Sequence, residues 1–85
     1  MMKIPINSNL DCIIDHKKDG CRREDPHCHI VRRGTRVAQI WLNPVSVAYG
    51  HSLDRRELIM ALNVVEANRS RLLDQYLYNM YNGAD

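Results

Sequence analysis

The hydrophobic pattern of this chain changes its period near residue 50, and this change limits the folds open to it. Before that point, apolar and polar residues alternate in short runs separated by turn-forming residues, which is typical of β-strands with one buried face. After residue 54, apolar residues recur every three or four positions, which is typical of amphipathic helices. We therefore expect an α+β fold, a small antiparallel sheet of about four to five strands followed by two C-terminal helices packed on one face.

The chain has 85 residues, which is enough for one hydrophobic core and too few for two. We expect a single domain over residues 1–85, with a sheet-forming half at about 1–50 and a helical half at about 54–82. A core of this size gives marginal stability, which a homodimer interface, a protein partner or a metal would supplement. No apolar run approaches the roughly 20 residues that span a bilayer, and no signal-peptide core follows the first methionines. The sequence therefore predicts a soluble, cytoplasmic protein without a membrane partner.

Turn-forming residues divide the first half of the chain into short strands. Residues 17–20, 33–34 and 43–44 each contain a Gly or Pro in a setting that favours a tight turn. The strands are expected at residues 4–6, 10–15, 27–32, 35–42 and 45–49. The first of them contains Pro5, so it should lie at an edge of a meander-like sheet.

Two helices are predicted in the second half. Asp54 and Glu57 have the spacing of a capping box, in which the side chain of each residue bonds to the backbone N–H of the other. The apolar stripe that follows would reach Arg69 at the same period, so one long helix fits poorly. We expect a second helix that is capped by Asn68 and ends at residues 82–83. Its apolar stripe consists of Leu72, Leu73, Tyr76, Leu77 and Met80.

The chemistry of the chain is concentrated at residues 25–32, Asp-Pro-His-Cys-His-Ile-Val-Arg. Pro26 suits the start of a strand, because it favours extended backbone and lacks an N–H. Alternation then places His27 and His29 on one face, about 7 Å apart, with Cys28 on the other face. Imidazoles titrate near neutrality and bind metals, so these two histidines are the predicted catalytic pair. The alternative to a catalytic role is a structural one, in which both histidines are ordered surface residues on an exposed face of the sheet.

Arginines surround this strand and are candidates for binding phosphate. Residues 1–43 carry eight Lys or Arg against five acids, whereas residues 44–85 carry four against five. The candidate phosphate-binding residues are Arg33 and Arg36 at the predicted hairpin and Arg23 in the loop before the strand. Phosphodiester chemistry needs such cations to stabilise developing negative charge, together with an acid and a base. A solvated hairpin tip accounts for the same arginines equally well.

A zinc site is a narrower hypothesis. Zinc needs three or four ligands, and the candidates are His27 and His29 with Cys21, Cys12 or His16. The three cysteines are an odd number, which is typical of reduced intracellular thiols, and they form no pair of Cys-x-x-Cys motifs. Cys12 and Cys28 also suit small core positions. The prediction is therefore no cofactor, with zinc as the alternative.

The order of these motifs resembles a family of small bacterial proteins, the domain of unknown function numbered four-one-six-zero. Its members typically have Pro-Pro-His-Phe-His-Val where this chain has residues 25–30, and Gly-x-Leu-Pro-x-Arg where it has residues 50–56. The resemblance covers about residues 10–80. Asp54 stands in place of the helix-initiating Pro and Cys28 in place of Phe, and each suits the same structural role. Such proteins are often encoded beside a small antitoxin-like partner, so the resemblance implies a toxin–antitoxin or regulatory role without assigning a catalytic residue.

Two hypotheses for function follow. The first is a toxin–antitoxin-type or regulatory protein that acts on RNA or a nucleic-acid machine through His27, His29 and nearby arginines. If it is an enzyme, a ribonuclease-like phosphodiesterase is the expected kind. The alternative is a non-enzymatic protein–protein binding module, with or without stabilising zinc, that uses a sheet edge or the last helix. Tyr76, Tyr78 and Tyr81 occupy different sides of that helix, so at least one should be exposed to a partner.

Overall fold

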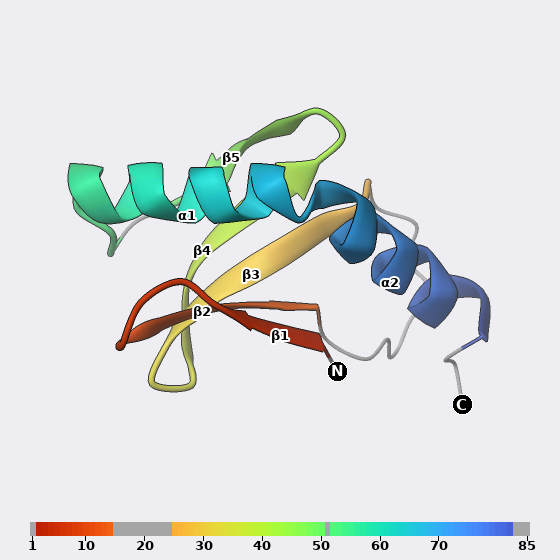
Figure 1. The fold of residues 1–85 in the computed structure, drawn as a ribbon, viewed down its shortest axis with the longest axis horizontal. Helices are drawn as coiled ribbons and strands as arrows, with labels where there is room; N and C mark the ends of the chain where they lie inside the picture. The colour runs from red at the N-terminus through yellow and green to blue at the C-terminus, as the bar shows by residue number, and fades with distance from the viewer. Residues whose placement is uncertain (1, 15–24, 51, 83–85) are drawn as a thin grey trace.

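The computed structural model describes residues 2–14, 25–50 and 52–82, and its described part consists of a five-stranded antiparallel sheet followed by two helices (Figure 1). The strands are β1 (Met2–Pro5), β2 (Leu10–Ile14), β3 (His27–Arg32), β4 (Thr35–Leu42) and β5 (Val45–Tyr49). The helices are α1 (Arg55–Ala67) and α2 (Arg69–Asn82). Consecutive strands pair in chain order. The α+β class and the meander predicted from the sequence are therefore confirmed.

The central strand of the sheet is β3, so the predicted histidine strand is paired on both sides. It joins β4 through a two-residue turn in which Arg33 and Gly34 both have positive φ, 51° and 86°. This is the turn geometry that matches the twist of a hairpin. At the sheet edge, β1 ends at Pro5, one residue earlier than expected. The turn predicted at 17–20 and the helix end predicted at residue 83 lie outside the described residues.

The hydrophobic core lies on one face of the sheet, between the strands and the two helices. The strand register pairs Cys12 with Ile30 and Cys28 with Ile40, and all four side chains are buried. Three helical residues join the same core cluster: Ala61, Val65 and Leu72. Both helices therefore cover the same face of the sheet, one after the other (Figure 1).

The start of α1 is fixed by the predicted capping box. The Asp54 carboxylate accepts a hydrogen bond of 2.8 Å from the Glu57 backbone N–H. In return, the Glu57 carboxylate accepts one of 3.1 Å from the Asp54 backbone N–H. Both N–H groups would otherwise lack partners within the helix, so the box stabilises this end.

The junction between the helices lies at Asn68, as predicted, but its side chain acts differently from an N-cap. The side-chain amide donates to the Val64 carbonyl at 2.9 Å and its oxygen accepts from Arg71 at 3.2 Å. Asn68 has ψ of 16°, whereas an N-cap residue needs extended backbone to reach the N–H groups ahead of it. The prediction that Asn68 caps the second helix is therefore wrong, because this side chain is turned back onto the end of α1.

Arg69 explains why the apolar stripe is interrupted at the start of α2. Its Nε donates to the carbonyl of Leu42 at 2.8 Å, and its Nη2 donates to the side chain of Asn43, also at 2.8 Å. These bonds attach α2 to the turn between β4 and β5, which contains the cis Asn43–Pro44 peptide bond. A polar residue at this position of the stripe therefore connects the helix to the sheet.

The outer side of α2 differs from the predicted stripe. Leu77 is 38% exposed, whereas Asn79 is 6% exposed. Tyr78 and Tyr81 are 60% and 80% exposed, which confirms that at least one tyrosine of this helix is accessible. With 13 and 14 residues, neither of the two described helices has the length and apolar character needed to cross a membrane.

An ion pair fastens the central strand to α1. Arg32, at the end of β3, donates to both carboxylate oxygens of Glu57 at 3.0 and 3.1 Å, and also to the carbonyl of Ser52 at 2.9 Å. The hydrogen bonds from Arg32 hold the pKa of Glu57 below its usual range and raise the pKa of Arg32. Such two-pronged Arg–carboxylate pairs are among the stronger polar contacts in proteins.

Glu57→Gln is expected to change how stability depends on pH. Because the folded state depresses the pKa of Glu57 below 4.5, its charge stabilises the fold above that pH and loses this effect as the pH falls through the folded-state value. The variant should be less stable at pH about 7 and should lose less stability on acidification. Urea titrations of both proteins over the acid range measure this. Glu66→Gln, on the exposed side of the same helix, is the control, and parallel curves for Glu57→Gln and wild type would contradict the prediction.

Candidate functional site

The two predicted catalytic histidines lie on the face of the sheet opposite the core residues of β3, and Tyr76 of α2 reaches the ring of His27 there. Cys28 and Ile30 alternate with them along β3 and are buried in the core. His27 and His29 are partly exposed. The alternation predicted from the sequence therefore describes this strand correctly.

The imidazole ring of His27 is surrounded by other rings. Its centroid lies 5.2 Å from that of His29, 5.9 Å from that of Trp41 on β4 and 5.3 Å from that of Tyr76 on α2. Its Nδ1 lies 3.0 Å from the backbone carbonyl oxygen of Asp25. A carbonyl oxygen can only accept, so Nδ1 carries the hydrogen in this contact and the lone pair of the neutral ring is on Nε2. The surroundings therefore orient His27 and select one tautomer.

Strand register shows which side chains share a face with the histidines, because directly opposite residues of antiparallel strands point to the same side. One row, from β1 to β5, consists of Lys3, Ile13, His29, Gln39 and Tyr49. The next row consists of His27, Trp41 and Ser46. A third row consists of Asp11, Val31 and Arg36. We call these three rows together the open face; its polar and aromatic side chains are exposed or partly exposed, whereas Ile13 and Val31 are buried.

A β-bulge places Arg36 on the open face. The register of β3 with β4 shifts by one residue here, so that Val31 lies opposite Arg36 and Val37 is the extra residue. Simple alternation back from the buried Ala38 would have put Arg36 on the core side. From the strand spacings, the backbones of Arg36 and His29 lie about 8 Å apart, which an arginine side chain can bridge.

The other predicted arginines lie elsewhere or outside the described residues. Arg33 is exposed at the hairpin tip, four positions beyond His29 and about 13 Å away along the strand. Arg32 is held on the opposite side by its ion pair with Glu57. Arg23 lies outside the residues that the structure describes. The structure thus brings Arg36, but not Arg33, close to the histidine pair.

The zinc hypothesis depends on residues that the structure does not describe. Cys21 and His16, two of its proposed third ligands, are among them. Cys12 and Cys28 are buried in the core, on the side of the sheet away from the histidines. A hydrogen bond to Cys12, together with burial, raises the pKa of the Cys28 thiol well above its usual range. Within residues 2–14, 25–50 and 52–82, no three His, Cys, Asp or Glu side chains gather into a metal-binding group.

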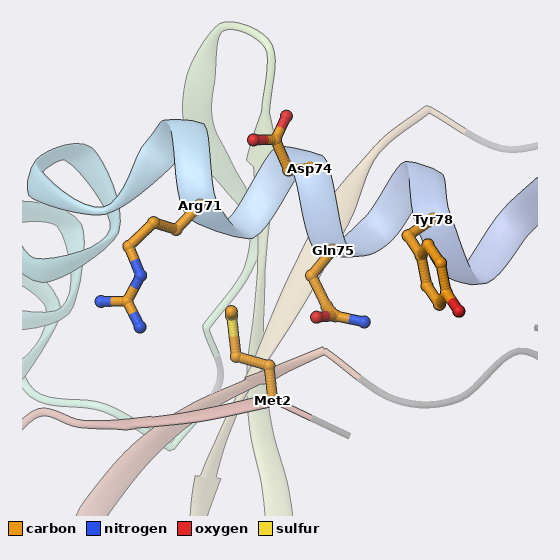
Figure 2. A pocket seen from close by; sticks show the side chains of 5 residues that line it. All are labelled: Met2, Arg71, Asp74, Gln75 and Tyr78. Carbon is orange, nitrogen blue, oxygen red and sulfur yellow. The ribbon is translucent and has the colours of Figure 1, made fainter.

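A pocket of about 430 Å³ lies apart from the histidines, between α2 and β1 (Figure 2). Its lining residues are Met2, Arg71, Asp74, Gln75 and Tyr78. Figure 2 shows Met2 pointing from β1 toward Gln75 of the helix. None of the predicted site residues that the structure describes lines it, so it is a surface feature separate from the histidine pair.

Sequence reasoning missed three neighbours of the histidines, Gln39, Trp41 and Tyr76, and also Tyr49, which lies across Gln39 from His29. A signal for Gln39 and Trp41 was present, because they alternate with apolar residues of the same strand and so must face away from the core. No local signal existed for the tyrosines, which come from the edge strand and from the second helix. Their proximity depends on strand register and helix docking.

Comparison with known proteins gives one positive result. The family model described as a domain of unknown function, DUF4160, matches residues 16–76, which include both histidines, the β3–β4 hairpin and α1. No curated protein and no solved structure matches the chain. The description of the matched family assigns no function to it, so a function for this chain has to be argued from the residues of the site.

Proposed function

We propose that this chain, which belongs to the DUF4160 family of domains of unknown function, is a toxin–antitoxin-type protein that acts on RNA through its open face. The observation that carries the proposal is the pair of imidazole rings of His27 and His29, 5.2 Å apart, on the same face as Arg36. An acid, a base and a cation are sufficient for cleaving a phosphodiester without a metal. The arrangement supports a ribonuclease-like activity.

In the proposed reaction, the 2′-hydroxyl of a ribose attacks the adjacent phosphorus. Nε2 of His27 accepts the hydroxyl proton as the new P–O2′ bond forms, and protonated His29 donates a proton to the 5′-oxygen as the P–O5′ bond breaks. The products are a 2′,3′-cyclic phosphate and a free 5′-hydroxyl, so no other reactant is needed. Arg36 stabilises the negative charge that develops on the phosphate oxygens. Arg33, farther along the hairpin, binds the phosphate of a flanking nucleotide.

The test is incubation of the purified protein with a single-stranded RNA of mixed sequence, with and without a chelator. We expect cleavage that persists in chelator and leaves cyclic phosphate ends. DNA of the same sequence should stay intact, because it lacks the attacking 2′-hydroxyl. Cleavage of the DNA, or RNA cleavage that needs added zinc, would contradict this mechanism. RNA that stays intact under all conditions would overturn the catalytic role.

A protein-binding role is supported by a different surface. Tyr78 and Tyr81 on α2 are 60% and 80% exposed, and Tyr78 also lines the pocket beside Met2. Exposed tyrosines are enriched where proteins bind one another, since one ring offers both apolar area and a hydroxyl group. An antitoxin-like protein, or a second copy of the chain, is the proposed occupant. If RNA is neither bound nor cut, this is the function that the structure supports next.

A further inference from the structure

We infer that the open face binds single-stranded RNA by stacking its bases on Trp41 and Tyr49. The inference rests on the proposed function for its choice of RNA, and adds which form of RNA is bound and which side chains hold it. Both rings are partly exposed, on the face of the sheet opposite the core residues of β3 and β4. Aromatic rings on a sheet surface hold unstacked bases in many RNA-binding folds, because every base has a flat face.

The spacing of the two rings suits neighbouring bases. Tyr49 lies directly opposite Gln39, and Trp41 follows Gln39 by two residues, so the two aromatic residues are about 8 Å apart on a diagonal. Gln39 lies between them and offers an amide that can bond a base edge. On the other side of Gln39, His29 is the next residue of the row. We call Trp41 and Tyr49 the stacking platform. This platform therefore adjoins the proposed catalytic pair.

The contact between His27 and Trp41 links base binding to the reaction. Their ring centroids are 5.9 Å apart in an edge-to-face arrangement. A base stacked on the exposed part of Trp41 places its own ribose and phosphate beside the imidazoles, because sugar and base are covalently joined. Positioning the reacting group in this way is a large part of what a binding site contributes to a rate.

The charge of the open face fits a polyanion. Its three rows contain two permanent cations, Lys3 and Arg36, against a single acid, Asp11. Lys3 and Arg36 are both exposed. The phosphate backbone would lie along these cations while the bases meet the rings. A duplex cannot bind in the same way, since its bases are already stacked and paired.

Fluorescence provides a direct test, because Trp41 is the single tryptophan of the chain. The probe is a short 2′-O-methyl oligoribonucleotide, which the proposed reaction cannot cut. Titration with the single strand should quench Trp41 emission, whereas the same sequence as a duplex, and inorganic polyphosphate, should not. No quenching by the single strand, or equal quenching by duplex or polyphosphate, would overturn the inference.

Two substitutions at the same position separate ring stacking from apolar contact. With a labelled 2′-O-methyl strand, Trp41→Leu should weaken binding by at least about fivefold, the lower end of base–aromatic stacking, while Trp41→Phe should retain most of it. Ile59→Ala is the control, since Ile59 is 52% exposed on α1 and away from this face. Equal affinities for the Leu and Phe variants would contradict stacking. If circular dichroism shows that the Leu variant is unfolded, quenching of Trp41 emission in the wild-type protein still tests whether bases stack on this ring.

The two proposals fail in different ways. A protein that binds the 2′-O-methyl strand with quenching, yet never cuts ordinary RNA, contradicts the catalytic proposal and leaves the stacking platform standing. A protein that cuts RNA equally well with Leu or Phe at position 41 contradicts the platform alone.

Discussion

Replacing His27 and His29 together with alanine is expected to reduce RNA cleavage by at least about 100-fold, because one positioned acid or base contributes about 10²–10⁴ to a rate. The fold should survive, since both side chains are partly exposed and lie outside the core. Initial rates at saturating RNA measure the effect directly. Induced in bacterial cells at matched levels, the wild type should arrest growth and the double variant should not.

The pH dependence separates the roles of the two histidines. If one imidazole must be neutral and the other protonated, the wild-type rate should peak at an intermediate pH. His27→Ala should lose the acid limb of this profile and His29→Ala the alkaline limb, because the first acts as base and the second as acid. Ile59→Ala serves as the control for expression and folding. A double variant that cuts RNA or arrests growth as well as the wild type would place the function elsewhere, most simply on the exposed side of α2.

The histidine face was predictable from the sequence because strand alternation is local. His27 and His29 had only to be compared with the apolar residues that alternate with them, Cys28 and Ile30, to be assigned to the side away from the core. The same reasoning correctly assigned Cys28 to the core. The capping box of α1 was predictable for the same reason, since Asp54 and Glu57 contact each other within one turn.

The bulge in β4 could also be predicted from the sequence, because the register set by the turn conflicts with the register set by the hydrophobic pattern. A two-residue turn puts Arg32 opposite Thr35, and counting back from that pair puts His29 opposite Ala38. The hydrophobic pattern requires these two to face opposite sides, because Ala38 belongs in the core. One extra residue in β4, Val37, removes the conflict. The need for a bulge could therefore have been inferred, and with it the position of Arg36.

The remaining members of the site could not be read from local patterns. Lys3 and Tyr49 reach the row of His29 only because three or more strands pair in one particular register. Tyr76 has the spacing of a core residue in its helix, and its contact with the ring of His27 depends on where α2 docks. Such contacts join segments that are far apart in the chain. The sequence identifies which residues carry the chemistry, and tertiary packing determines which of them meet.

Leu72→Ala is expected to lower the free energy of unfolding by about 2–5 kcal/mol. The side chain of Leu72 is fully buried in the core cluster, whereas Leu73 and Tyr76 of the same helix pack against that cluster while partly exposed. A single small core supplies only about 3–5 kcal/mol in total, so the loss is comparable with the whole stability of the domain. Urea denaturation followed by circular dichroism measures the change.

Leu77→Ala is the matched control, because it makes the same chemical change in the same helix at a side chain that is 38% exposed. Its effect should be clearly smaller, since less apolar surface returns to water and any cavity is open to solvent. Equal losses for the two variants would show that α2 does not dock through Leu72. The pair also tests the site: α2 brings Tyr76 to 5.3 Å from the ring of His27. Under conditions where each variant is still folded, Leu72→Ala should therefore impair RNA cleavage more than Leu77→Ala, because a loosened α2 no longer holds the imidazole in place.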